Sequence, residues 1–240
     1  MRSTLARLLV AALCLTILPG SAAFAQVVPK PRPAVTAPPA AKAAPAAKAA
    51  PASKSDAAKA DHGTIYLIRG LADVFSLGMN KLGDRLSAKG VKATVTSQSY
   101  DQRITDQIAA AYKRDKTKAQ PIIIMGHSLG ANKALVIASR LGKKGIPVRL
   151  VVLFDATHKI PVPTNVEEVL NLHKPSALGV SIKGVEGYAG TIDNHDVSDI
   201  KGIGHVSIDK SKALHELVVE KVLQVLAEDP APQSKPTKKK

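Results

Sequence analysis

Short apolar runs alternate with amphipathic segments from residue 63 onward. The run at 121–125 is continuously apolar, as expected for a strand that is covered on both faces, whereas 91–97 alternates apolar and polar positions. Six segments in all have the composition of β-strands and are bounded by turn-forming residues. These segments are 64–68, 91–97, 121–125, 148–154, 166–172 and 191–197.

Apolar residues spaced three and four positions apart predict helices between these strands and after the last one. The first expected helix carries Phe75, Met79, Leu82 and Leu86, and the second carries Ile104, Ile108 and Tyr112 after a capping Asp101. The third covers 129–141 and the fourth covers 208–226. Buried strands that alternate with helices favour a parallel sheet. The pattern therefore predicts a three-layer αβα sandwich with a mostly parallel sheet.

The N-terminal segment has the pattern of a bacterial-type signal peptide. Arg2 and Arg7 precede an apolar run at 8–18, and Ala23-Phe24-Ala25 offers a cleavage site. We expect a signal peptide over 1–25, with an uncleaved anchor as the alternative. The single cysteine lies within this run, so the mature chain would hold no thiol for disulfides, catalysis or metal binding. An exported protein, periplasmic or extracellular, is expected.

Two segments are poor in bulky apolar residues and cannot bury enough surface to offset their chain entropy. Residues 26–62 are rich in Ala, Pro and Lys, and residues 229–240 form a basic tail. We expect both to be disordered, with the folded domain at 63–228. The net charge of +15 resides largely on these arms and the signal segment. Basic arms favour contact with an anionic envelope surface or serve as a solubilising tether, and no nucleic-acid motif is present.

The sequence Gly126-His127-Ser128-Leu129-Gly130 directly follows the most apolar strand and opens an amphipathic helix. This context fits a G-x-S-x-G nucleophile elbow, in which a tight strand-to-helix turn projects the serine hydroxyl into a cleft. Glycines two residues to either side permit close backbone packing. A capping serine in an ordinary turn is the alternative interpretation.

With this motif the chain resembles the α/β-hydrolase superfamily, in a small lipase-, esterase- or thioesterase-like form over residues 64–226, a minimal α/β-hydrolase fold. The resemblance implies a triad in the order Ser, acid, His. Ser128 is then the nucleophile, and His205, in a glycine-containing loop before the last helix, is the expected base. His195 is the competing base. The other histidines are interpreted as surface or helix residues.

Asp155 is the expected acid because it ends the fourth strand, at the sheet edge that carries active sites in this class. Many members of the superfamily place the acid one strand later. That position points instead to Asp193, Asp196 or Asp199.

The resemblance also implies an oxyanion hole of two backbone N–H groups. One is expected from Leu129, and the other from Leu71 in the turn after the first strand. The turn reads Arg69-Gly70-Leu71 and departs from the His-Gly-Gly pattern common there. Arg69 is a candidate for binding a substrate carboxylate or phosphate, or for a structural ion pair.

The expected activity is hydrolysis of a small-molecule ester or thioester through an acyl-serine intermediate, in an open and shallow cleft without a lid. No zinc-type ligand spacing or Gly-rich phosphate loop occurs, and no cofactor is inferred. An acyltransferase that uses the same serine is one alternative. The other is a non-catalytic, envelope-binding module with the same fold.

Overall fold

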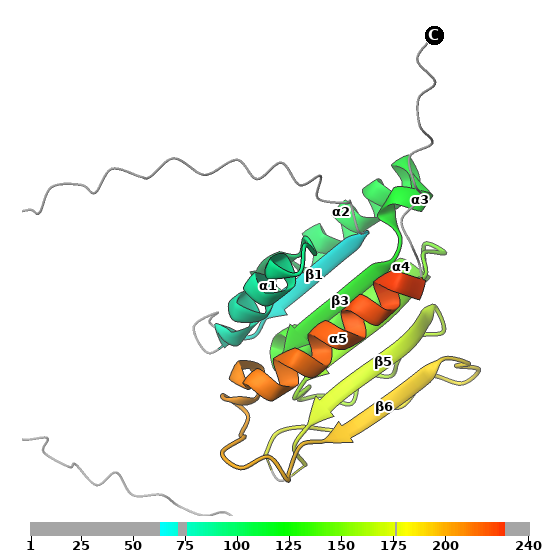
Figure 1. The fold of residues 1–240 in the computed structure, drawn as a ribbon. Coiled ribbons are helices and arrows are strands. Elements are labelled where there is room, and N and C mark those ends of the chain that lie inside the picture. The colour runs from blue at the N-terminus through cyan, green and yellow to red at the C-terminus, as the bar shows by residue number, and fades with distance from the viewer. Residues whose placement is uncertain (1–62, 72–75, 176, 229–240) are drawn as a thin grey trace, which may run out of the picture. The chain divides into compact units, whose positions relative to one another are not determined.

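Six strands form one sheet in which every neighbouring pair is parallel (Figure 1). The computed structural model describes residues 63–71, 76–175 and 177–228. The expected signal peptide, linker and tail, and Phe75, lie outside these residues. The strand order is β2-β1-β3-β4-β5-β6. The strands are β1 (Thr64–Arg69), β2 (Thr94–Ser97), β3 (Ile122–His127), β4 (Val148–Phe154), β5 (Val166–His173) and β6 (Thr191–Asp196).

Helices cover both faces of this sheet. They are α1 (Gly78–Ala88), α2 (Asp101–Arg114), α3 (Lys116–Ala119), α4 (Leu129–Gly142) and α5 (Lys212–Glu228), with 3₁₀ turns η2 (Gln98–Tyr100) and η3 (Ile208–Lys210). Strand alternation divides the core between the two faces. Ile123 and Met125 of β3 pack with α1 and α5, whereas Ile122 and Ile124 pack with α2 and α4. The predicted three-layer arrangement is therefore confirmed.

Loops replace helices over part of one face. Within the described chain, coil segments 155–165 and 174–190 connect β4 to β5 and β5 to β6. Prolines and glycines in these segments disfavour helix, and Val162 and Ile182 are buried beside the α2–α4 core. Strands and helices thus alternate up to β4, and no helix is predicted or found between β4 and β6 over the described residues.

Some predicted boundaries are wrong. The strand predicted from residue 91 begins at Thr94, and the helix predicted over 208–226 is divided into η3 and α5. Asp101 does not cap α2, because it is the first helical residue. Its carboxylate instead accepts hydrogen bonds from Lys133 Nζ at 2.9 Å and Arg140 Nη1 at 3.1 Å on α4. Asp101 therefore joins two helices of one layer.

The strand order places a topological switch point between β1 and β3. The chain leaves β1 toward β2 on one side, and then builds β3 to β6 on the other. Connections that diverge in this way leave a crevice outside the carboxyl ends of the two strands, where ligands of such sheets bind. The turn at 69–71 follows β1 and Ser128 follows β3. The fold thus brings the two predicted halves of the oxyanion hole together.

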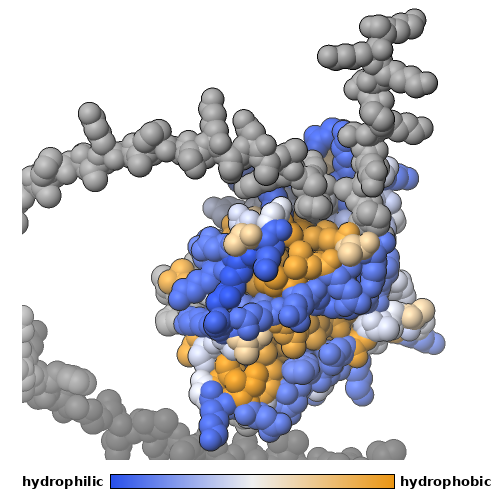
Figure 2. Space-filling model, viewed as in Figure 1, coloured by the Kyte–Doolittle hydropathy of each residue, from blue (hydrophilic) through white to orange (hydrophobic). Residues whose placement is uncertain are grey.

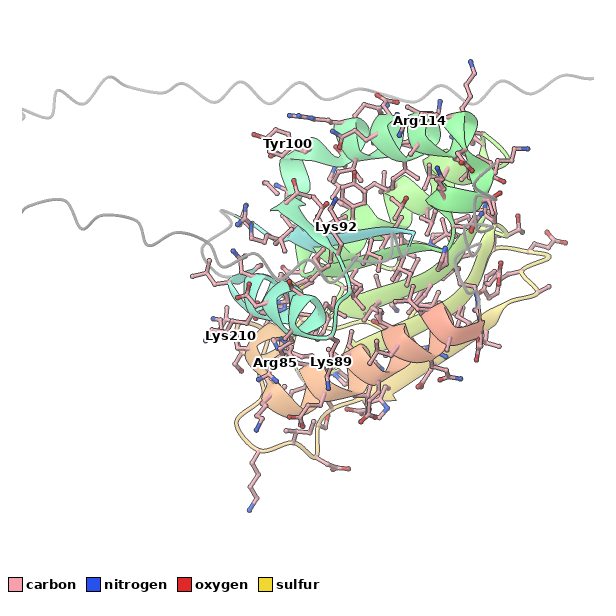
Figure 3. The ribbon with its side chains drawn as sticks, turned by 45° about the horizontal axis from the view of Figure 1, so that its top comes forward. Arg85, Lys89, Lys92, Tyr100, Arg114 and Lys210 are labelled. Carbon is pink, nitrogen blue, oxygen red and sulfur yellow. The ribbon has the colours of Figure 1, made fainter. Side chains whose placement is uncertain are left out.

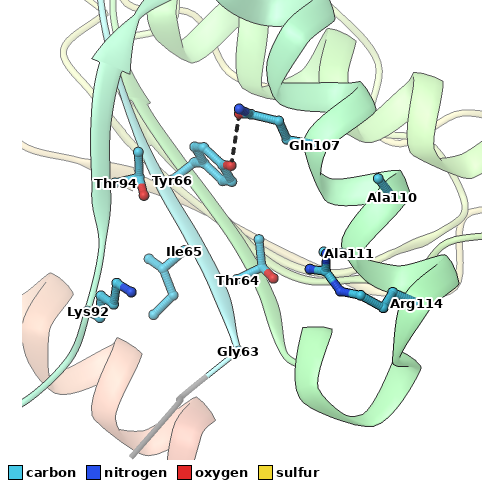
Figure 4. A pocket seen from close by; sticks show the side chains of 10 residues that line it. All are labelled: Gly63, Thr64, Ile65, Tyr66, Lys92, Thr94, Gln107, Ala110, Ala111 and Arg114. Atoms are coloured by element: carbon cyan, nitrogen blue, oxygen red, sulfur yellow. Dashed lines mark hydrogen bonds between the residues drawn. The ribbon is translucent and has the colours of Figure 1, made fainter. Parts of the chain in front are cut away.

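A cavity of about 440 Å³ lies at the opposite, amino-terminal end of β1, between the β1–β2 edge and α2 (Figure 4). Within it Tyr66 Oη donates to Gln107 Oε1 at 3.3 Å, and burial raises the pKa of Tyr66. Because this cavity adjoins Gly63 at the start of β1, it is separate from the crevice beside Ser128.

The outer surface is mixed in character. Apolar patches lie among hydrophilic residues on the face that carries α1 and α5 (Figure 2). Exposed basic residues come from several elements, including Lys89, Lys92, Arg114 and Lys210 (Figure 3). The positive charge of the folded domain is therefore spread over its surface.

Candidate active site

Ser128 occupies the turn between β3 and α4 in a backbone conformation that non-glycine residues rarely adopt. Its φ is 57° and its ψ is −122°. The neighbouring strand supports this turn, since Ser128 N donates to Phe154 O at 2.9 Å. The side chain makes no capping hydrogen bond to α4. Ser128 therefore occupies the N-cap position of α4 but does not cap the helix through its side chain.

The two glycines of the motif are required by close backbone contact. A Cβ atom on Gly126 would overlap the backbone of Gly130 and Ala131. A Cβ atom on Gly130 would overlap the carbonyl oxygen of Ile68 in β1. Neither clash could be relieved by rotating a side chain, because the atoms met are backbone. The G-x-S-x-G spacing thus allows α4 to start against β1 and β3.

The structure brings Ser128, His205 and Asp155 together in one hydrogen-bonded row. His205 Nε2 lies 2.9 Å from Ser128 Oγ, and His205 Nδ1 lies 2.7 Å from Asp155 Oδ2. An ionised carboxylate only accepts hydrogen bonds, so Nδ1 carries the proton and Nε2 is free to accept one from the serine hydroxyl. This arrangement can draw a proton from Ser128 and stabilise the imidazolium that results.

Asp155 is fully buried at the end of β4. Its second carboxylate oxygen, Oδ1, accepts a hydrogen bond from Lys174 N at 2.9 Å, directly after β5. Lys174 Nζ in turn donates to Ile203 O at 2.8 Å, which ties the end of β5 to the loop that carries His205. A buried carboxylate with partners on both oxygens is held in one orientation, and this orientation presents Oδ2 to His205.

The competing candidates lie elsewhere. Asp193 and His195 line a separate cavity between β5, β6 and α5. Asp196 Oδ1 accepts from Ser198 N at 2.8 Å in the turn after β6, and these hydrogen bonds with Ser198 lower the pKa of Asp196. Asp199 is exposed. Among the candidate acids named from the sequence, Asp155 is the one that contacts His205 in the structure.

The two residues expected to supply oxyanion donors flank the same pocket as Ser128. Leu129 is the first residue of α4, so its N–H belongs to the first turn, whose donors have no partner within the helix. Leu71 follows β1, and its side chain is 61 % exposed. Arg69 Nη1 lies 3.5 Å from Asn80 Oδ1 of α1.

The pocket beside Ser128 has a volume of about 400 Å³ and a mostly apolar lining. Three of its residues are large apolar side chains that stay more than half exposed to solvent: Leu71 at 61 %, Leu178 at 58 % and Val206 at 53 %. Thr157 adds a polar group. Asn132 Oδ1 of α4 accepts from the backbone N–H groups of Thr157 and His158, which holds this wall in place.

Sequence reasoning missed two buried polar residues, Ser76 and His127, which line the pocket together with Ser128. His127 is 1 % exposed, which contradicts its interpretation as a surface or helix residue, and its ring centroid lies 5.2 Å from that of His205. Ser76 Oγ lies 2.7 Å from His127 Nδ1. The position of His127 inside the serine motif was a signal for a role at the site. Nothing in the sequence pattern singles out Ser76.

The described residues hold neither a cluster of metal ligands nor a membrane-spanning helix. No group of three or more His, Cys, Asp or Glu side chains in these ranges is arranged to hold a metal ion. No helix in the same part of the chain is both long and apolar enough to cross a membrane.

The chain was compared with known proteins. No curated protein matches it. One solved structure, from Xanthomonas campestris pv. campestris and described as a hydrolase of the alpha/beta superfamily, covers 69 % of this chain and 99 % of its own, at 16 % identity and a TM-score of 0.42. The family model of the thioesterase domain matches residues 80–227. Because this match spans well over half of the sequence, the chain belongs to the thioesterase domain family, in keeping with the resemblance predicted from its motif.

Proposed function

We propose that this hydrolase cleaves a carboxylic ester or thioester through an acyl-serine intermediate on Ser128. The observation that carries the proposal is the position of His205, within hydrogen-bond distance of both Ser128 Oγ and Asp155 Oδ2. A serine hydroxyl is a weak nucleophile unless an adjacent base removes its proton. The triad-like row supports an activated serine over the alternative of a non-catalytic binding module.

In the proposed reaction, Ser128 Oγ attacks the acyl carbon while His205 Nε2 takes the hydroxyl proton. Asp155 stabilises the imidazolium, and the N–H groups of Leu71 and Leu129 donate to the oxyanion. His205 then gives its proton to the leaving alcohol or thiol as the carbon–oxygen or carbon–sulfur bond breaks. A water molecule, deprotonated by His205, releases the carboxylic acid and restores the serine.

The apolar pocket supports a hydrocarbon acyl group as the part of the substrate that is bound. Leu71, Leu178 and Val206 surround the serine, and burying their exposed surface against an acyl chain is favourable by about 25 cal/mol per Å². The pocket is open to solvent along this apolar rim, in keeping with the shallow cleft expected from the sequence.

The experiment that tests this proposal is labelling of the purified protein with a fluorophosphonate probe, followed by mass spectrometry of the modified peptide. We expect modification of Ser128, together with turnover of p-nitrophenyl butyrate and of a butyryl thioester. Ser128→Ala and His205→Ala should both lose labelling and turnover. The matched control is Ser87→Ala, an exposed serine on α1. A folded protein that shows neither labelling nor turnover would contradict the proposal and favour the binding module.

We further propose that the enzyme is exported and works outside the cytoplasm, as a folded domain at 63–228 with basic arms on either side. The N-terminal pattern that ends at Ala25 supports this proposal. N-terminal sequencing of the protein recovered from a secreting host should begin at Gln26. A chain that keeps Met1 and stays in the cytoplasm would contradict export.

A further inference from the structure

A row of buried hydrogen bonds links the turn after β1 to the loop that carries His205. Gly70 N donates to Ser76 Oγ at 2.9 Å, and Ser76 Oγ lies 2.7 Å from His127 Nδ1. On the other side of the same ring, His127 Nε2 lies 2.8 Å from the carbonyl oxygen of His205. His127 therefore stands between the predicted oxyanion turn and the backbone of the predicted base.

The donors and acceptors in this row fix the direction of every bond. The carbonyl oxygen of His205 only accepts, so His127 Nε2 must carry a proton. Burial lowers the pKa of His127 to about 4, and the ring is therefore neutral near pH 7 with Nδ1 as an acceptor. Ser76 then donates its single hydroxyl proton to Nδ1 while it accepts from Gly70 N. Ser76 and the His127 ring thus each donate one hydrogen bond and accept one, and every proton in the row has an acceptor.

The hydrogen bonds of this row are also shielded from water, which raises the free-energy cost of breaking them. Ser76 and His127 are each 1 % exposed. A buried polar group that loses its partner cannot turn to solvent, so its neighbours must move to find new partners. The groups that would move are Gly70, beside the proposed donor Leu71, and the backbone of His205.

We propose that His127 is a positioning residue, which holds the loop of the base His205 and the oxyanion turn after β1 in a fixed relation through its two ring nitrogens. This inference rests on the function proposed above. It goes beyond that function because His127 is not one of the three triad residues. A displacement of about 1 Å between reacting groups can slow a reaction about 100-fold. Loss of His127 should therefore lower kcat strongly. Ser76 and His127 line the pocket beside Ser128, but each is only 1 % exposed, so the surface that binds the acyl group, and hence KM, should change much less than kcat.

The test is steady-state hydrolysis of p-nitrophenyl butyrate by wild type, H127F, H127Q, S76A and the double variant S76A/H127F. H127F keeps a ring and removes both hydrogen bonds, and S76A breaks the row from its other end. We expect kcat to fall about 10- to 100-fold in each, with KM within about two-fold of wild type. H127Q, whose amide reaches the position of Nε2, can donate to the carbonyl of His205 but leaves Ser76 without its acceptor, so it should lose no more kcat than S76A and less than H127F.

The double variant separates a linked row from two independent packing defects. If His127 couples the two loops, S76A/H127F should be less than about three-fold slower than H127F, because the second change breaks a row that is already broken. Independent defects would multiply. The control is N165A, which removes two hydrogen bonds from Asn165 Nδ2, to Ala138 O and Ile146 O, away from the site. It should lower Tm and leave kcat unchanged.

Several outcomes overturn the proposal. The proposal is overturned if kcat of H127F is within two-fold of wild type. It is also overturned if the kcat loss of S76A/H127F equals the product of the losses of S76A and H127F. If H127F does not fold, S76A and H127Q provide the same comparison, and unchanged kcat in S76A overturns the link. S128A separates this result from the proposed function. If wild type hydrolyses p-nitrophenyl butyrate faster than S128A, the proposed function is supported whatever the result for His127. If the two rates are equal, both the proposed function and the role of His127 are overturned.

Discussion

Asp209 provides a sharp test of how burial controls charge in this fold. It is fully buried in η3, and its Oδ2 accepts a hydrogen bond from Gly78 N at the start of α1, at 2.9 Å. His127 Nδ1 lies 4.0 Å from the same oxygen. Burial raises the pKa of Asp209 from 3.8 to about 6, although nearby Lys210, the Gly78 N–H and His215 act to lower it.

The direction of the stability change follows from this raised pKa. A carboxyl whose pKa is higher in the folded state than in the unfolded state holds its proton more tightly when folded. Its contribution to stability is fully present below pH 3.8 and is lost as the pH rises through about 6. A shift of about two pKa units corresponds to about 3 kcal/mol, since one unit is worth about 1.4 kcal/mol.

Asp209→Asn should remove this pH dependence while its amide oxygen still accepts from Gly78 N. Thermal unfolding of wild type and variant would be followed from pH 4 to pH 8. Relative to wild type, Tm of the variant should rise across this range by about 6 to 12 °C, at 2 to 4 °C per kcal/mol for a domain of this size. Asp199→Asn, at an exposed site, is the control and should follow wild type. A Tm difference that stays constant from pH 4 to pH 8 would refute the reasoning.

Two further predictions concern stability. Asp101 bridges Lys133 and Arg140. Burial acts to raise the pKa of Asp101, but the hydrogen bond from Lys133 and the charges of both residues lower it overall. Its contribution to folding stability is therefore present above pH 3.8 and is lost as the pH falls below that value. Asp101→Asn should cost about 1 kcal/mol at pH 7, and urea unfolding should show the difference from wild type shrinking in acid; a loss of equal size at pH 7 and pH 3 would contradict this. Leu135 is fully buried in α4, and Leu135→Ala should lower the free energy of unfolding by about 2 to 5 kcal/mol, with fluorophosphonate labelling of the folded fraction unchanged. A change below 1 kcal/mol would show that the core around α4 collapses to fill the cavity.

Local pattern accounts well for the strands. The strand predicted at 148–154 is found with the same bounds. The strand predicted at 166–172 continues by one residue, to His173. The buried segments 122–125 and 150–154 are continuous apolar runs, and such runs are visible in the sequence without knowledge of their neighbours.

Contacts between distant segments explain what the sequence left open. The proximity of Ser128, Asp155 and His205 was expected from the order of residues in a family, and their roles in catalysis stay predictions. The link through Ser76 and His127 joins residues 51 positions apart and follows no local pattern. The same holds for Asp209, which binds the N-terminus of α1 from 131 positions further along the chain. Such side chains look like ordinary polar residues until the fold brings them together.

The coil segments after β4 and β5 form part of the pocket wall, whereas Ser128 and Asp155 lie at the ends of strands. Ser128 and Asp155 stand at the ends of strands, on backbone that the sheet holds rigid. Thr157 and Leu178 lie on the coil segments instead and form one wall of the pocket. These segments can therefore be exchanged for others of different length or polarity without moving the strand ends. Substrate range could then evolve, or be redesigned, by loop replacement while the reacting groups stay in place.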